Sequence, residues 1–221
     1  MNSNSLEGTL SEAHFANLSK LEHFYVTSNY ELKFRVGYDW VPSFHQLKYL
    51  EMGSVEIGGQ FPQWLQTQKS LVWLSLWNCS ITGMLPKWLS SFTNLTILVL
   101  SGNHIGGPIP ELSSRLESLY LDRNFIDGPI PDDSLCKMKG LSYLDLSNNR
   151  LSGNLPHCLG NLESLYLASL SSNQILGPIP NTIGQASNLD WLQLNNNSIT
   201  GEIPYSLQNC TNLEVLDIGD N

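Results

Sequence analysis

The sequence predicts an α/β solenoid, a right-handed, curved superhelix that spans residues 1–221 as one domain of about nine stacked coils. Three features of the sequence support this fold class. Leucine recurs at intervals of 21 to 26 residues, and in seven successive units a glycine stands twelve residues after that leucine and a proline three residues later. A unit this short cannot bury its own apolar side chains, so neighbouring units must stack to make a core.

The start of each unit is expected to form a short strand. In the clearest unit, LSYLDLSNNRLSGNLPHCLGNLES at residues 141–164, leucine stands at positions 1, 4 and 6. The alternation at positions 4, 5 and 6 is typical of a half-buried strand. Equivalent strands in successive units predict a parallel sheet on the concave face of the solenoid. Position 1 is occupied by Leu21, Leu47, Leu71, Leu95, Leu116, Leu141, Leu165, Leu189 and Leu213.

An asparagine at position 9 is expected where the chain turns inward after the strand. Its side-chain amide can pair with backbone groups of adjacent coils that would otherwise be buried without partners. This position is held by Asn29, Asn103, Asn124, Asn149, Asn173, Asn197 and Asn221, and Asn4 matches it in an incomplete first coil. Val55 and Cys79 replace the asparagine in two units. Cys79 is therefore predicted to be a structural residue.

The glycine and proline shape the return path of each coil. Glycine at position 13 permits a tight bend or a close approach between coils. Proline at position 16 fixes φ and closes the extended segment, so short helices or irregular segments are expected to follow it on the convex side.

Two units depart from the pattern. The second has Lys33 at the glycine position, and residues 30–46 are predicted to form an irregular, outward loop. The unit from Leu95 to Arg115 is three residues short and is expected to lose its convex helix. Both ends of the chain fall within a repeat and show no capping sequence, which indicates a fragment of a longer protein.

Composition excludes several functions. The formal net charge is −9 and only 14% of residues are charged, against about 25% in an average protein, so the phosphate backbone of a nucleic acid is not an expected partner. No run of eighteen apolar residues and no signal peptide occur, so direct membrane insertion by this chain is not expected either. The five histidines are scattered, and zinc-protease, serine-hydrolase and phosphate-loop motifs are missing. The sequence therefore predicts a protein that is not an enzyme and has no metal or cofactor.

The repeat LxxLxLxxNxLxGxIPxxL resembles the plant-specific subclass of leucine-rich repeats found in the ectodomains of plant cell-surface receptors. The segments SEAHFANLSKLEHF, DWVPSFHQLKYL, FPQWLQTQKSL and ITGMLPKWL are similar to the mid-to-late repeats of plant receptor-like proteins. These are transmembrane receptors without a cytoplasmic kinase. The resemblance implies a non-catalytic recognition module on the extracellular side of the plasma membrane, which binds a peptide or protein ligand or a co-receptor in defence or developmental signalling. Two alternatives are a soluble leucine-rich repeat inhibitor of microbial wall-degrading enzymes and an inactive truncated gene product.

The concave face is the predicted binding surface, because side chains at positions 3, 5, 7 and 8 point to solvent there. Rigidly displayed aromatic and arginine side chains are preferred at interface hot spots. One group comprises Tyr25, Tyr49, Glu51, Trp73 and Trp77, and a second comprises Tyr120, Asp122, Arg123, Tyr143 and Asp145. For Tyr49 and Trp73, lateral packing that only stiffens the sheet is an equally good interpretation.

Cysteines and glycosylation sequons complete the candidates. Cys136 and Cys158 lie on consecutive coils, whose spacing of about 4.8 Å suits a disulfide, but their three-residue stagger leaves the pairing open. Cys210 is expected to be a buried small residue. Among the sequons, Asn17 and Asn94 are the better glycosylation candidates because they precede strands, outside the concave face.

Overall fold

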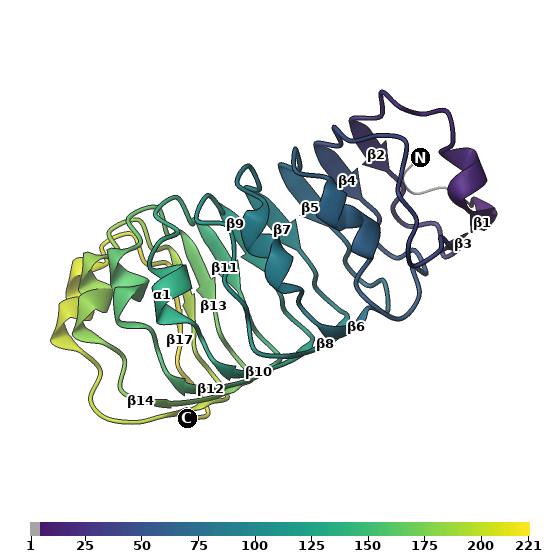
Figure 1. Ribbon diagram of the computed structural model, residues 1–221. Helices are drawn as coiled ribbons and strands as arrows, with labels where there is room; N and C mark the ends of the chain where they lie inside the picture. The colour runs from purple at the N-terminus through teal and green to yellow at the C-terminus, as the bar shows by residue number, and fades with distance from the viewer. Residues whose placement is uncertain (1–4) are drawn as a thin grey trace.

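The computed structural model describes residues 5–221, so Asn4 lies outside the described part. The coils stack side by side from the purple N-terminal end to the yellow C-terminal end (Figure 1). One strand from each of nine coils joins a single parallel sheet, which confirms the predicted solenoid. Its strands are β2 (His23–Tyr25), β4 (Tyr49–Glu51), β5 (Trp73–Ser75), β7 (Ile97–Val99), β9 (Ser118–Tyr120), β11 (Tyr143–Asp145), β13 (Leu167–Ser169), β15 (Trp191–Gln193) and β17 (Val215–Asp217).

The register of this sheet keeps equivalent repeat positions side by side. Tyr143 of β11 lies between Ser118 of β9 and Leu167 of β13, for example. The middle residue of each strand from β2 to β15 is buried in the core, and Leu50, Leu74 and Leu144 are fully buried. The residues on either side of it therefore face solvent on the concave face, as strand alternation requires.

The predicted asparagine ladder is confirmed by its hydrogen bonds. The Asn149 Oδ1 atom accepts from the amide of Ile126 at 3.0 Å, and its Nδ2 donates to the carbonyls of Leu121 and Leu146 at 2.9 and 3.1 Å. Asn173 repeats the same contacts one coil further on. Each ladder amide thus satisfies polar backbone groups inside a coil and between two coils.

A second parallel sheet follows the ladder and was not predicted from the sequence. It lies along the lower edge of the molecule in Figure 1 and joins six strands. They are β6 (Thr82–Met84), β8 (His104–Gly107), β10 (Phe125–Pro129), β12 (Arg150–Asn154), β14 (Gln174–Gly177) and β16 (Ser198–Ile199). The repeat glycine ends or bends these strands, as at Gly153, where φ is +78°. Such a backbone conformation is accessible to glycine without a steric cost.

Short helices occupy the side opposite the nine-stranded sheet. They are η2 (Gln63–Thr67), η3 (Lys87–Ser91), α1 (Asp132–Leu135), η4 (His157–Asn161), η5 (Asn181–Gln185) and η6 (Tyr205–Asn209), and η1 (Glu12–His14) precedes them in the chain. Each of η2–η6 and α1 begins directly after the repeat proline, which is its N-cap. Within the described residues no helix lies between β8 and β9, which confirms that the short unit lacks one.

Residues 30–46 match the predicted irregular, outward loop only in part. Residues Glu31–Phe34 form β3, which pairs in parallel with β1 (Glu7–Leu10). Phe34 and Phe44 are only 1% exposed. Trp40 contacts both rings and also the ring of Trp64, 5.3 Å away. The apolar residues Leu32, Phe34 and Phe44 therefore pack into the core in spite of the missing glycine. Residues 35–46 form no regular element, and Tyr30, Tyr38 and Val41 are exposed.

Candidate functional site

The aromatic group on the N-terminal half of the concave face spans β2, β4, β5 and the turn after β5. The rings of His23 and Tyr49 are stacked with their centroids 4.7 Å apart. Trp73 lies beside Tyr49 in the register, and its indole nitrogen is buried with no partner among the described residues. These contacts support lateral packing for Tyr49 and Trp73. Tyr25 and Glu51 remain half-buried next to them.

Trp77 is held differently, by a close approach to the backbone. Its indole lies over Gly53 of the neighbouring coil, where a Cβ atom would come within 2.0 Å of the ring. The lack of a side chain at Gly53 therefore leaves room for the Trp77 indole. The indole stays half-exposed on the rim of the concave face. A ring fixed in this way offers a ligand apolar area at a small cost in conformational entropy.

We expect Gly53→Ala to displace the Trp77 indole. The substitution should increase quenching of tryptophan fluorescence by iodide and cost about 1–3 kcal/mol in the free energy of unfolding, as overpacking does. In a Trp77→Ala background the same substitution should cost less than about 1 kcal/mol, because the clashing ring is gone. Gly106→Ala, whose Cβ would meet only the carbonyl oxygen of Phe125 at 3.6 Å, is the matched control. If Gly53→Ala cost the same free energy of unfolding in both backgrounds, packing of the Trp77 indole on Gly53 would be contradicted.

The second predicted group comes together on β9, β11 and the turn after β9. The register sets Tyr120 beside Asp145, and the backbone carbonyl of Asp145 accepts from the Leu121 amide at 2.8 Å. The Ser101 hydroxyl donates to Asp122, whose side chain is 17% exposed. Arg123 is 77% exposed and its Nε atom lies 4.0 Å from Asp122. Tyr143 completes the patch at the surface.

Burial and neighbouring charges both shift the pKa values of this patch. Partial burial raises the pKa of Asp122, the Ser101 hydrogen bond opposes that change, and the Asp145 carboxylate adds to it. Burial, Tyr143 and the two carboxylates likewise raise the pKa of Tyr120. Burial is the largest cause of both shifts, and the neighbouring carboxylates add to it.

Further concave residues stand at position 2 of the repeat, which the sequence-based prediction of the binding surface did not include. Tyr166, Asp190 and Glu214 hold this position in three successive coils and line an open hollow of about 740 Å³. A hydrogen bond to Asp190 is the main cause that raises the pKa of Tyr166. The signal was present in the sequence as acidic residues one position before the concave strands.

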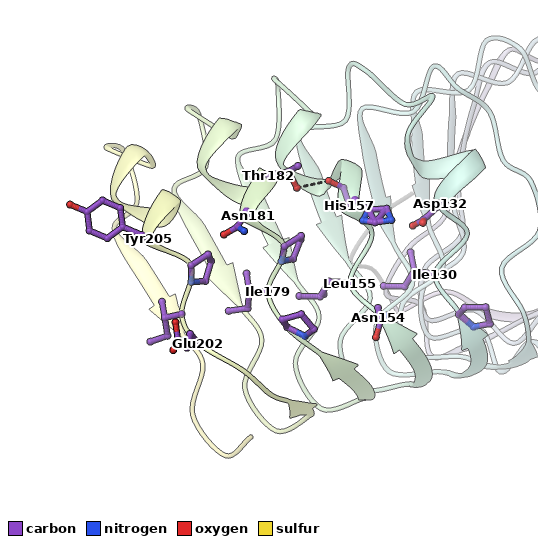
Figure 2. A pocket seen from close by; sticks show the side chains of 15 residues that line it. Ile130, Asp132, Asn154, Leu155, His157, Ile179, Asn181, Thr182, Glu202 and Tyr205 are labelled. Atoms are coloured by element: carbon purple, nitrogen blue, oxygen red, sulfur yellow. Dashed lines mark hydrogen bonds between the residues drawn. The ribbon is translucent and has the colours of Figure 1, made fainter.

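Another hollow lies on a different side of the molecule, next to the second sheet. It is an open groove of about 1040 Å³. Figure 2 shows Ile130, Leu155 and Ile179 in a row, with side chains from the starts of the short helices along one edge. There the Thr182 hydroxyl donates to the carbonyl of His157 at 2.5 Å. The residue before each repeat proline supplies this row, so the signal is present in the sequence as an aliphatic residue that recurs at that position.

The cysteines have structural roles in the described chain. Cys136 and Cys158 form a disulfide with Cα atoms 5.5 Å apart, which joins α1 to η4. Cys79 is buried, its thiol donates to the carbonyl of Met52 at 2.8 Å, and burial raises its pKa to about 12. Cys210 is buried and its thiol donates to the carbonyl of Ile183 at 3.2 Å. Neither free thiol is poised to react.

Other candidate features are distributed over the surface. Asn17 and Asn94 are exposed outside the concave face. Within residues 5–221 no three histidine, cysteine or acidic side chains are grouped as metal ligands. None of the helices in that range is long and apolar enough to cross a membrane.

Comparison with known proteins shows what these repeats resemble. A family model described as Leucine rich repeat matches residues 114–175, and another described as Leucine Rich Repeat matches residues 70–92, 94–114 and 188–210. Over 64 residues the chain is 42% identical to Receptor-like protein EIX2 of Solanum lycopersicum, a match that covers 29% of this chain and 6% of the tomato protein.

Solved structures of plant receptors have the same fold. The plant peptide hormone receptor RGFR1, solved in complex with RGF2, is 28% identical with a TM-score of 0.89, over 98% of this chain and 35% of that one. The Arabidopsis receptor kinase HAESA, solved with the peptide hormone IDA and the co-receptor SERK1, is 25% identical with a TM-score of 0.76, over 99% of this chain and 44% of that one. The matched parts thus amount to less than half of each relative.

Proposed function

We propose that this chain of leucine-rich repeats, which resemble those of plant receptor ectodomains, is a non-catalytic recognition module of a plant receptor-like protein. It would bind a peptide or protein on its concave face. One observation carries the proposal. The nine-stranded sheet presents two groups of partly exposed aromatic and charged side chains, and its solvent face is not covered by any described segment.

The residues proposed to contact the ligand differ in what they contribute. Trp77 and Arg123 are the leading anchors, because aromatic and arginine side chains dominate interface energetics. Tyr25, Tyr143 and the carboxylates of Glu51, Asp122 and Asp145 would add polar contacts. Tyr49, Trp73 and Tyr120 would add packing area beneath them.

The proposed setting is the extracellular side of the plasma membrane, as part of a receptor that signals in defence or development. The disulfide between Cys136 and Cys158 supports an oxidising compartment. Asn17 and Asn94 are the proposed glycosylation sites, since their glycans would leave the concave face free. A co-receptor is a further proposed partner, supported by the HAESA complex, whose title includes the co-receptor SERK1.

A glycan placed on the concave rim should block ligand binding. Arg150→Ser creates a sequon at Asn148, an exposed residue beside the concave face. It is made in a chain in which Ser80→Ala and Ser198→Ala remove the sequons already present at Asn78 and Asn196, the equivalent position of two other coils. Peptides selected from a random display library against the secreted chain should bind the glycosylated variant at least tenfold more weakly, because the sugar would cover the sheet.

The matched control places a glycan on the opposite side. Glu163→Thr creates a sequon at Asn161, which ends η4. Mass spectrometry establishes occupancy in both variants. Binding to this control should stay within about twofold of the unmodified chain. Selected peptides that ignore the glycan at Asn148, or that are lost only with the glycan at Asn161, would contradict a concave binding face.

A further inference from the structure

Charge is unevenly distributed along the concave face. In the four coils from Leu21 to Asn103, positions 1 to 7 hold two carboxylates, and one of them, Glu22, is paired with Lys48 at 2.8 Å. From Leu116 onward the same positions hold six carboxylates and no lysine or arginine. They are Glu117, Asp122, Asp145, Asp190, Glu214 and Asp217. We call the concave surface of β9, β11, β13, β15 and β17 the acidic half.

Within residues 5–221, no close ion pair neutralises these carboxylates. Arg123, at position 8, lies at the 4.0 Å limit of an ion pair with Asp122 and is largely solvated, so it compensates little. The other contacts are uncharged. Asp145 accepts from the Ser147 amide at 3.0 Å, and Asp217 from the Gly219 amide at 3.2 Å. These bonds hold the carboxylates in place and leave their charge available to a ligand.

Aromatic rings lie between the carboxylates of the acidic half. Tyr143 and Tyr166 are in contact with ring centroids 5.7 Å apart, and both are exposed. Trp191, two strands beyond Tyr143 in the same column, is 38% exposed. Arginine and lysine combine an apolar stem with a cationic head, and guanidinium groups stack on aromatic rings. This surface therefore suits long cationic side chains better than a simple metal ion or a neutral chain.

We propose that the acidic half of the concave face docks a basic, extended peptide segment, whose arginine or lysine side chains lie on Tyr143, Tyr166 and Trp191 and reach the carboxylates beside them. The proposal rests on the concave face being the binding surface. It commits to a peptide because the carboxylates are spread over five coils instead of converging on one point. Charge complementarity is the property that selects this partner.

The distance between the N-terminal aromatic group and the acidic half also constrains the sequence of the peptide. Three sheet steps separate Trp73 on β5 from Tyr143 on β11, which is about 14 Å at the usual strand spacing of about 4.8 Å. An extended chain covers that distance in about four residues. The ligand is therefore expected to carry an apolar or aromatic side chain about four residues away from its basic cluster.

The test uses a fluorescent peptide, acetyl-Arg-Gly-Arg-Gly-Arg-Gly-amide, and its analogue with citrulline in place of each arginine. Citrulline keeps the shape of the side chain and removes the charge. Fluorescence anisotropy with the whole chain should give at least tenfold weaker binding for the citrulline peptide. The affinity for the arginine peptide should also fall when salt is raised from 50 to 150 mM.

Variants locate the interaction on the acidic half. Asp122→Asn with Asp145→Asn should weaken binding of the arginine peptide at least tenfold and flatten its salt dependence. Asp127→Asn with Glu202→Gln changes the net charge equally at exposed residues away from the concave strands and should leave binding within twofold. Equal losses in both pairs, equal binding of the citrulline peptide, or no binding of the arginine peptide would overturn the proposal.

Failure of the acidic-half proposal can be distinguished from failure of the proposed function. Library peptides that are blocked by the glycan at Asn148 yet carry no basic cluster would overturn the acidic-half proposal alone. Library peptides that ignore that glycan would overturn the concave binding face itself.

Discussion

Replacing Asn103 with alanine is expected to lower the free energy of unfolding by about 3–6 kcal/mol. Asn103 is 4% exposed. Its Oδ1 accepts from the amides of Cys79 and Ile81, each at 3.0 Å, and its Nδ2 donates to the carbonyls of Leu76 and Leu100, each at 2.8 Å. Alanine would leave four buried backbone groups without this partner, at about 1–3 kcal/mol for each group that water cannot reach.

Two further variants sharpen this prediction. Asn103→Cys keeps a donor but no amide-like acceptor, as Cys79 does in its own coil, so it should lose less stability than alanine. It also provides a measurable variant if Asn103→Ala is not secreted. Asn181→Ala, at an exposed helical residue, should stay within about 0.5 kcal/mol. The measurement is urea unfolding followed by circular dichroism, and a loss below about 1 kcal/mol for Asn103→Ala would contradict a ladder that stabilises the stack.

The ladder could be predicted from the sequence because it depends on one residue type repeated at one position. The concave strands could be predicted for the same reason, since alternation at Leu144 and its neighbours defines which side chains are buried. The residues of the second candidate group, such as Tyr120 and Asp145, followed from that alternation without further information.

Other features could not be predicted from the sequence because they depend on contacts between coils. The second sheet forms where extended segments such as β10 and β12 lie side by side, and their sequences show no clear alternation. The fold of residues 30–46 depends on Trp40 meeting Trp64 from the next unit. The outer groove exists only because the row of Ile130, Leu155 and Ile179 is assembled by stacking.

Gly160→Ala is expected to destabilise the chain by about 3 kcal/mol or more, although nothing in the repeat pattern singled it out. Its φ is not in the left-handed region, so the effect comes from close packing. A Cβ atom at Gly160 would lie 1.7 Å from the carbonyl oxygen of Thr182 and 2.3 Å from its carbonyl carbon, where η4 meets η5. Backbone atoms cannot move aside as a flexible side chain can, so the helices must separate.

The disulfide is expected to make this clash costlier, because it restrains η4 from the other side. Cys158 lies in η4 and is bonded to Cys136, which follows α1 directly. The clash can therefore be relieved only by moving η5 or by distorting η4 against the disulfide. In a background of Cys136→Ser with Cys158→Ser, η4 can shift toward α1. The cost of Gly160→Ala should then fall by about 1 kcal/mol or more, a coupling typical of residues that share one packing constraint.

Gly140→Ala is the matched control for this cycle. Its Cβ would meet only the Cγ atom of Glu117, at 3.8 Å, and its φ is also outside the left-handed region. It should therefore be neutral or slightly stabilising in both backgrounds, because alanine restricts the unfolded chain. Denaturant unfolding of all variants decides between two explanations. A cost of Gly160→Ala that is the same with and without the disulfide would mean that η5 moves instead of η4, and that the disulfide does not restrain η4.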